Sequence, residues 1–208
     1  MTHEIRVLAD MRLESRADDE PVRLVGYAAV FDQATDIGGY FRERVARGAF
    51  SEALNRDDIH ALFNHDYGNV IGRKKAGTLT LAEDERGLRV EILPPNTQLA
   101  RDLMENIKAG NIDQMSFAFS MEGGSQTWDE TGETPMRTIE RVGELFEVSV
   151  VPRGAYPTTE IGLRSLDAHR KESAKTGYSI RRAIRSAKMQ MNLALIEREG
   201  QGCAPDAC

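Results

Sequence analysis

The chain has 208 residues, of which 40% are hydrophobic and 29% charged, and it carries a formal net charge of −6 at pH 7. A chain of this size can bury one good core, and a domain of ~150 residues with an appendage is its natural division. No apolar run approaches the ~18 residues of a membrane span, and residues 1–12 lack the apolar block of a signal peptide. We therefore expect a soluble, cytoplasmic protein with no membrane association.

Acidic and basic residues are unevenly divided along the chain. Residues 1–163 contain 28 acidic and 18 basic side chains, whereas residues 164–198 contain 9 basic and 3 acidic ones. This division predicts one folded domain, residues 1–163, followed by a basic helical tail, residues 164–208, that is partly disordered. Apolar residues recur in the tail at the spacing of an amphipathic helix: Ile180, Ala183, Ile184, Ala187, Met191 and Leu195.

A basic amphipathic helix suits docking onto an acidic protein partner, which makes the tail a candidate for targeting or partner binding. A solvated charged face is the commoner explanation of such a bias, and of the two partners nucleic acid is the less favoured. An ordinary terminal helix packed on the domain is the open alternative. The two cysteines, Cys203 and Cys208, fit neither a disulfide framework nor a zinc site, and we interpret them as incidental.

In chain order, β-forming runs predict strands at residues 22–31, 59–66, 78–81, 88–93, 113–120 and 145–151. A polar turn closed by Gly87 joins the third and fourth of these as a hairpin. A short helix is expected near residues 51–54, and a longer one is expected to begin at the cap Thr97 and end at Gly110. The hydrophilic stretch 122–135, which holds the single tryptophan, is predicted to be a mobile loop.

The strand at 113–120 separates large apolar side chains from small ones, with Met115, Phe117 and Phe119 expected toward the core and Ser116, Ala118 and Ser120 opposite. Small neighbours leave room for a substrate backbone beside Ser116, as a nucleophile requires. The simpler interpretation is a half-buried strand whose serines face solvent. The strand at 145–151 is expected to follow the same pattern, with Phe146, Val148 and Val150 in the core and Glu147 and Ser149 on the other face.

His65 stands where a predicted strand meets a loop. An imidazole in such a place can face a cleft and change its charge near neutral pH, which is what a general base for a serine hydroxyl requires. The alternative is a surface loop histidine. His60 and His65 are also conceivable metal ligands, but no further His or Cys lies nearby to complete a site, and we expect no metal.

Five groups of residues follow one another along residues 20–160: Gly26-Tyr27-Ala28-Ala29-Val30-Phe31, Gly48-Ala49-Phe50, Asn64-His65-Asp66, Met115-Ser116-Phe117, and Glu147-Val148-Ser149-Val150-Val151 with Ala155-Tyr156-Pro157. Each group is short and common, but in this order and spacing they resemble the prohead (capsid maturation) protease family of tailed bacteriophages. The resemblance implies a serine endopeptidase related to the herpesvirus assembly proteases. The implied fold is α+β, with a mainly antiparallel, β-barrel-like core surrounded by helices, followed by the C-terminal helical tail.

Transferred residue by residue, the resemblance implies that Ser116 is the nucleophile and His65 the general base. Herpesvirus enzymes use a second histidine as the third member, but the other histidines of this chain, His3, His60 and His169, lie in no matching motif. A carboxylate is therefore expected, and Glu147 is preferred because its side chain is predicted on the same face as Ser116. Three other carboxylates remain open: Asp66, Asp113 and Glu144.

The implied activity is cleavage of the scaffold, or of a scaffold-like segment of the major capsid protein, inside the immature capsid in the host cytoplasm. Self-cleavage is also expected, and no cofactor is implied. Backbone amides or Arg153 are the candidate donors to the oxyanion. The cleavage sequence, the oligomeric state, and an origin in a phage, a prophage or a gene-transfer particle are left open. The alternative functions are a noncatalytic binding module and a scaffold component of capsid assembly.

Overall fold

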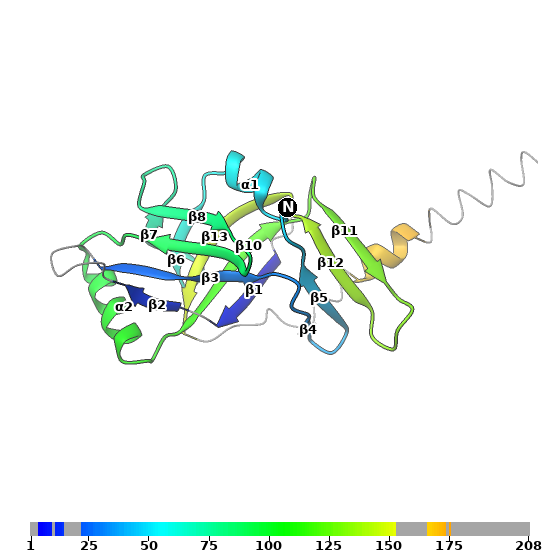
Figure 1. The fold of residues 1–208 in the computed structure, drawn as a ribbon, viewed down its shortest axis with the longest axis horizontal. Helices are drawn as coiled ribbons and strands as arrows, with labels where there is room; N and C mark the ends of the chain where they lie inside the picture. The colour runs from blue at the N-terminus through cyan, green and yellow to red at the C-terminus, as the bar shows by residue number, and fades with distance from the viewer. Residues whose placement is uncertain (1–3, 10, 15–21, 153–165, 174, 176–208) are drawn as a thin grey trace, which may run out of the picture. The chain divides into compact units, whose positions relative to one another are not determined.

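The computed structural model describes residues 4–9, 11–14, 22–152, 166–173 and 175. The chain divides into two compact units, Met1–Gly162 and Leu163–Cys208, and the fold below is that of the first (Figure 1). In the second unit residues 166–173 are helical. The expected amphipathic helix and both cysteines lie outside the described residues. None of the described helices is long and apolar enough to cross a membrane.

The first unit is a strand-rich α+β fold with few helices, as the α+β prediction requires. Its described helices are α1 (Ser51–Arg56) and α2 (Gln98–Lys108). Its described strands are β1 (Glu4–Ala9), β2 (Met11–Glu14), β3 (Arg23–Val30), β4 (Thr35–Ile37), β5 (Phe41–Val45), β6 (His60–Phe63), β7 (Asp66–Arg73), β8 (Leu79–Glu83), β9 (Gly87–Ile92), β10 (Gln114–Ser120), β11 (Ser125–Asp129), β12 (Met136–Arg141) and β13 (Glu144–Val151).

The strands form three sheets, with the orders β1-β10-β13-β6-β7, β11-β12-β5-β4 and β2-β3-β9-β8. Most pairs are antiparallel, but β13 pairs with β6, and β12 with β5, in parallel. The expected barrel-like core is therefore wrong in one respect: the sheets do not close into a barrel. The consecutive strands β1 and β2 pair into different sheets, with β10 and β3, so the chain changes sheets there instead of continuing one ladder. Within the first unit only two described helices, α1 and α2, accompany the strands, too few to surround the core.

Strand β10 follows the predicted alternation on its core side. Met115, Phe117 and Phe119 all belong to the buried apolar cluster, and the Phe117 ring centroid lies 5.3 Å from those of both Phe50 and Phe119. The opposite face is buried as well, because the side chain of Ser116 is 0% exposed and that of Ser120 only 3%. The interpretation in which these serines face solvent is wrong.

Two local predictions are confirmed. Strands β8 and β9 form the expected antiparallel hairpin, and the Asp84 carboxylate closes its turn by accepting from the backbone N–H groups of Arg86 and Gly87 at 2.8 and 3.0 Å. Thr97 caps α2 by accepting from the Ala100 N–H at 3.2 Å. Gly110 follows this helix with φ of +75°, a conformation that glycine adopts without steric cost.

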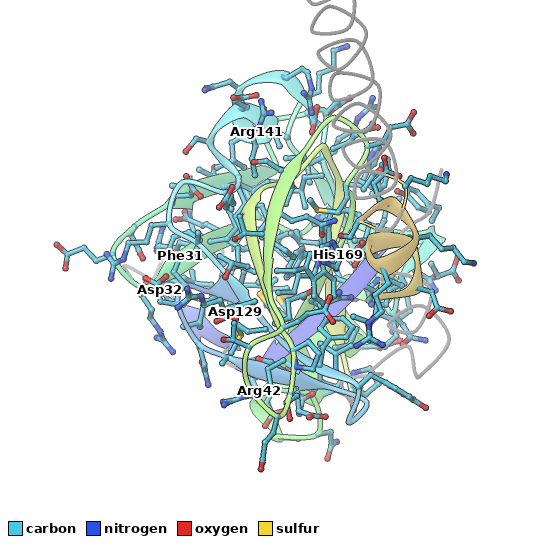
Figure 2. All side chains as sticks on the ribbon, turned by 90° about the vertical axis from the view of Figure 1, so that its right-hand side faces the viewer. Phe31, Asp32, Arg42, Asp129, Arg141 and His169 are labelled. Carbon is cyan, nitrogen blue, oxygen red and sulfur yellow. The ribbon has the colours of Figure 1, made fainter. Side chains whose placement is uncertain are left out.

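The predicted mobile loop at 122–135 is wrong, because β11 lies within it and pairs with β12 in an antiparallel hairpin. The Trp128 ring packs 4.9 Å from the ring of Phe41, which anchors the hairpin to β5. The sequence did not predict β11 because its residues are mostly polar. Trp128 is its one large apolar side chain, and a single such residue cannot show the alternation typical of a strand. Figure 2 views the unit from the side of this hairpin and shows charged, exposed side chains such as Arg42 and Asp129 around it.

A buried cluster of charged side chains joins β1 to β5 and β12. Arg137 is 1% exposed and donates to Glu4 at 2.5 and 2.9 Å and to Glu43 at 2.8 Å. Arg6 donates to Glu4 at 2.8 Å and also to Glu43. Two carboxylates and two guanidinium groups thus neutralise one another. Because burial is costly for any of them alone, the cluster fixes the N-terminal strand to the second sheet.

Replacing Glu4 with glutamine is expected to lower the free energy of unfolding at neutral pH by about 3 kcal/mol, because the buried Arg137 and the largely buried Arg6 lose a partner charge. Burial by itself raises the pKa of Glu4, but the hydrogen bonds and charges of Arg137 and Arg6 outweigh it and hold the pKa below its ordinary value of 4.5. Glu4 therefore contributes its stability above that value and loses it as the pH falls through the lowered pKa. Urea denaturation at pH 7 and below pH 4 measures both effects.

Glu105→Gln is the matched control for this experiment, since Glu105 makes an ion pair with Lys108 on an exposed face of α2. We expect that substitution to change the unfolding free energy by less than about 0.5 kcal/mol. A Glu4→Gln protein as stable as the wild type at pH 7, or a stability difference that persists unchanged in acid, would contradict the role assigned to the cluster.

Candidate active site

His65 occupies a two-residue turn between β6 and β7, closed by the pairing of Phe63 with Asp66. Asn64 and His65 have φ of +56° and +60°, the left-handed conformation that such hairpin turns require and that non-glycine residues adopt at some cost. Two hydrogen bonds attach the turn to β13. The Asn64 N–H donates to the Val150 carbonyl at 2.9 Å, and the His65 N–H donates to Ser149 Oγ at 3.2 Å.

The imidazole of His65 is hydrogen-bonded to Glu147, the carboxylate preferred above as the third member. Nδ1 of His65 lies 2.7 Å from Oε1 of Glu147, and the two side chains are 20% and 2% exposed. An ionised carboxylate only accepts hydrogen bonds, so in the neutral imidazole this contact places the proton on Nδ1 and leaves the lone pair on Nε2. Nε2 is buried and has no hydrogen-bond partner among the described residues. The imidazole is thus prepared to accept a proton.

Glu147 reaches this position at an irregularity of the sheet. The register between β10 and β13 shifts between Ala118 and Phe119, so one residue of β13 is left over. Leu145 consequently faces the core in place of Phe146, whose expected core position is wrong. Bulges of this kind re-aim a side chain and are frequent beside active sites.

Ser116 lies on β10 directly opposite Ser149 of β13, which places both side chains on one face of the sheet. The Ser116 hydroxyl donates to the carbonyl oxygen of Arg6 on β1 at 2.7 Å. It is therefore not hydrogen-bonded to His65 in this structure. The structure brings His65 and Glu147 into contact and sets Ser116 on the adjacent strand.

Ser149 links these groups, and the sequence analysis assigned it no role. Its hydroxyl donates to Glu147 Oε2 at 2.5 Å and accepts from the His65 backbone. The signal was present in the alternation, because Ser149 stands two residues from Glu147 on the same strand face. Single serines are common in strands, so the alternation alone does not predict a functional role for Ser149.

The three competing carboxylates make other contacts or lie elsewhere. Asp66 accepts from the Gly68 N–H and the Asn69 amide, at 2.7 and 2.9 Å, and so stabilises its own turn. Asp113 is exposed just before β10. Glu144 lines a pocket at the start of β13. Arg153, the candidate oxyanion donor, lies outside the described residues.

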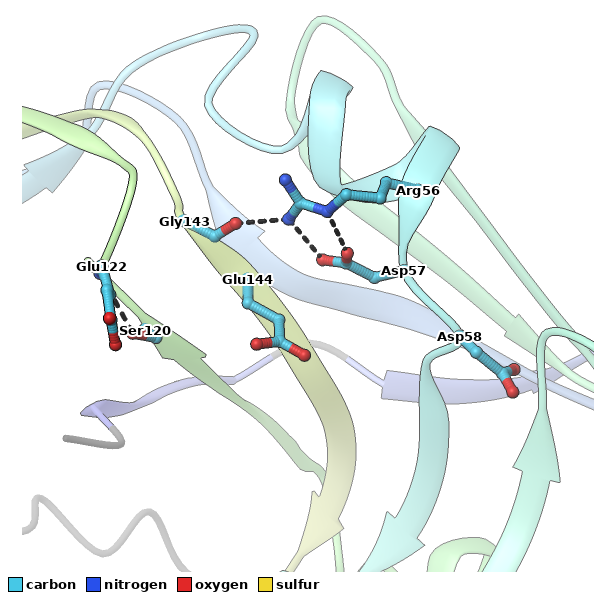
Figure 3. Close-up of a pocket in the computed structure, with 7 residues that line it drawn as sticks. All are labelled: Arg56, Asp57, Asp58, Ser120, Glu122, Gly143 and Glu144. Carbon is cyan, nitrogen blue, oxygen red and sulfur yellow. Dashed lines mark hydrogen bonds and ion pairs between the residues drawn. The ribbon is translucent and has the colours of Figure 1, made fainter. Parts of the chain in front are cut away.

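That pocket does not include Ser116, His65 or Glu147. Figure 3 shows Arg56 at its side, donating to the Asp57 carboxylate and to the Gly143 carbonyl. The second oxygen of Asp57 also accepts from the Leu145 N–H at 2.9 Å. These contacts join the end of α1 to β13, which is a structural role.

Two aromatic side chains lie beside the His65–Glu147 pair. His60 is the register partner of Glu147 on β6, and its ring centroid lies 5.8 Å from that of Tyr67. The pKa of Tyr67 is raised, first by burial and then by the negative charges of Glu147 and Glu144. This phenol, which is 55% exposed, therefore stands within the electrostatic field of the carboxylate that faces His65.

Comparison with known proteins identifies the family. Among solved structures, that of the bacteriophage T4 capsid assembly protease, gp21, is similar with a TM-score of 0.43 and 13% sequence identity, over 71% of this chain and 98% of that chain. Curated proteins give no match. The family model described as caudovirus prohead serine protease matches residues 10–172. Since this match spans most of the sequence, the chain belongs to the caudovirus prohead serine protease family.

Proposed function

We propose that this chain is the serine endopeptidase of capsid maturation in a tailed bacteriophage, with Ser116 as nucleophile, His65 as general base and Glu147 as the residue that orients the imidazole. The observation that carries the proposal is the 2.7 Å contact between His65 Nδ1 and Glu147. Together with the unpartnered, buried Nε2, it gives an imidazole of fixed orientation on the sheet that also carries Ser116.

A serine hydroxyl is a poor nucleophile at neutral pH, so a neighbouring base must take its proton during attack on the scissile carbonyl. In the proposed mechanism the Ser116 hydroxyl leaves the Arg6 carbonyl and donates to His65 Nε2. The proton later passes from the imidazolium to the leaving amine. Glu147 stabilises the imidazolium by accepting from Nδ1 throughout. The developing oxyanion needs preorganised donors, for which backbone amides and Arg153 remain the candidates.

We further propose the substrates that the family setting suggests: the scaffold or a scaffold-like segment of the major capsid protein, and the protease's own chain, all inside the prohead in the host cytoplasm. A fold relationship to the herpesvirus assembly proteases is part of this proposal, and the motifs of residues 20–160 support it. The proposed role of residues 164–208 is to carry the enzyme into the prohead by docking on an acidic partner. A protein truncated after residue 165 would then cleave an added peptide but fail to enter proheads.

The experiment is co-expression with the capsid protein encoded nearby, followed by mass measurement of both chains. With the wild-type protease we expect a shortened capsid or scaffold chain with one defined new terminus. With Ser116→Ala in the same plasmid we expect every chain at full length. Full-length chains with the wild-type enzyme would favour a noncatalytic assembly role, and equal cleavage by both proteins would refute Ser116 as the nucleophile.

A further inference from the structure

We propose that Ser149 is a positioning residue of the proteolytic site, whose single hydroxyl holds the general base and its carboxylate partner at the same time. This inference rests on the proposed function, because it assumes that His65 and Glu147 act in proteolysis. It adds a fourth residue to the three that the sequence suggested.

Ser149 supports the carboxylate of the His65–Glu147 pair. Glu147 is 2% exposed, so water cannot satisfy its two oxygens as it would at the surface. Oε1 accepts from His65 at 2.7 Å, and Oε2 accepts from the Ser149 hydroxyl at 2.5 Å. Ser149 thus supplies the second donor that a buried carboxylate requires. Without it, the carboxylate could turn away from the imidazole to find another donor.

Ser149 also supports the backbone of the general base. His65 has φ of +60°, and such a conformation persists only where the surroundings hold it. Its N–H donates to Ser149 Oγ at 3.2 Å, while the preceding Asn64 N–H donates to the Val150 carbonyl. The Ser149 contact is therefore the hydrogen bond of the turn nearest to the imidazole. One oxygen atom fixes both ends of the His65–Glu147 interaction.

The geometry assigns Ser149 support rather than attack. Its hydroxyl proton is given to Glu147 Oε2, and His65 approaches it through the backbone N–H instead of the ring. Nδ1 of the imidazole is hydrogen-bonded to Glu147 and is therefore not available to take a proton from Ser149. Ser116 and Ser149 are equally buried, so the difference between them lies in their contacts: the Ser149 oxygen both donates to Glu147 and accepts the His65 N–H.

A positioning role predicts a change in the pH profile that mere packing would not. A hydrogen bond donated to an ionised carboxylate favours the ionised form over the protonated one. Ser149→Ala removes such a bond from Glu147, and proteolysis requires the neutral imidazole, so the substitution is expected to displace the pH profile. The acidic limb of kcat/KM therefore moves to higher pH. The other ionisable groups near the pair, His60, Tyr67 and Glu144, are unchanged by the substitution.

The test compares Ser149→Ala with Ser120→Ala on a fluorogenic peptide that spans the cleavage site mapped by co-expression. Ser120 is a matched control, since it is 3% exposed, lies on the adjacent strand and accepts one backbone N–H, that of Glu122, at 3.0 Å. For Ser149→Ala we expect kcat to fall about tenfold or more, KM to stay within about twofold, and the acidic limb to rise by about one pH unit. Ser120→Ala should keep the wild-type kcat and pH profile.

An acidic limb of Ser149→Ala that coincides with the wild type would overturn the proposal, whatever the loss in kcat. If the alanine protein does not fold, Ser149→Cys replaces it, because a thiol of similar size is a weak hydrogen-bond donor and should shift the limb in the same direction. A cysteine variant with the wild-type limb would likewise reject the role. Failure of the proposed function has a different signature, namely full activity of Ser116→Ala.

Discussion

Ser116→Ala is expected to lower proteolysis by about 10⁶-fold, to the level left by substrate binding and the oxyanion donors, because it removes the proposed nucleophile. Single-turnover cleavage of the mapped peptide measures this loss. The substitution also removes the hydrogen bond to the Arg6 carbonyl, so thermal unfolding should be recorded beside it. We expect a folded protein whose stability falls by only about 1 kcal/mol.

His65→Ala should be as inactive as Ser116→Ala, and the double variant scarcely worse than either, because the two residues act as one unit. His60→Ala is the matched control, since His60 lies on the same β6 hairpin but faces Tyr67. We expect it to keep most of its activity. A His65→Ala protein that cleaves at near the wild-type rate would remove His65 from the proposed mechanism.

Glu147→Gln is the second substitution with a large expected effect, a loss of about 10⁴-fold in kcat. An amide at this position has the same shape as the carboxylate but cannot stabilise the imidazolium, and it can hold the imidazole in the wrong tautomer. Because the buried side chain keeps its volume, we expect a folded protein. Steady-state kinetics with the mapped peptide separate the loss in kcat from any change in KM.

Glu144→Gln is the matched control for this loss, because Glu144 lies on the same strand and lines the pocket of Figure 3. It should leave kcat within about threefold of the wild type. If Glu147→Gln is active while Asp66→Asn or Asp113→Asn is inactive, the carboxylate that orients the His65 imidazole is that aspartate instead of Glu147.

Local rules predicted much of this fold, because the responsible interactions are themselves local. The alternation of β10, the hairpin at Asp84 and the cap at Thr97 each depend on residues a few positions apart. The same rules placed Glu147 on the face of Ser116, and the structure shows its contact with His65.

Other features depend on partners far along the chain, and periodicity could not reveal them. Arg137 is buried because Glu4, 133 residues away, neutralises it, and from the sequence it is simply a charged residue in a polar stretch. The bulge beside Glu147 is a property of two strands in register, and neither strand shows it alone. Ser149 became visible as a candidate only when its two hydrogen bonds were known.

The most direct test of the central claim is covalent labelling with a serine-directed phosphonate, followed by mass spectrometry of the labelled peptide. The proposed mechanism predicts one label on the full-length protein, at Ser116, with labelling lost in His65→Ala and strongly slowed in Glu147→Gln. A label at Ser149, or labelling of Ser116 that is equally fast without His65, would contradict it.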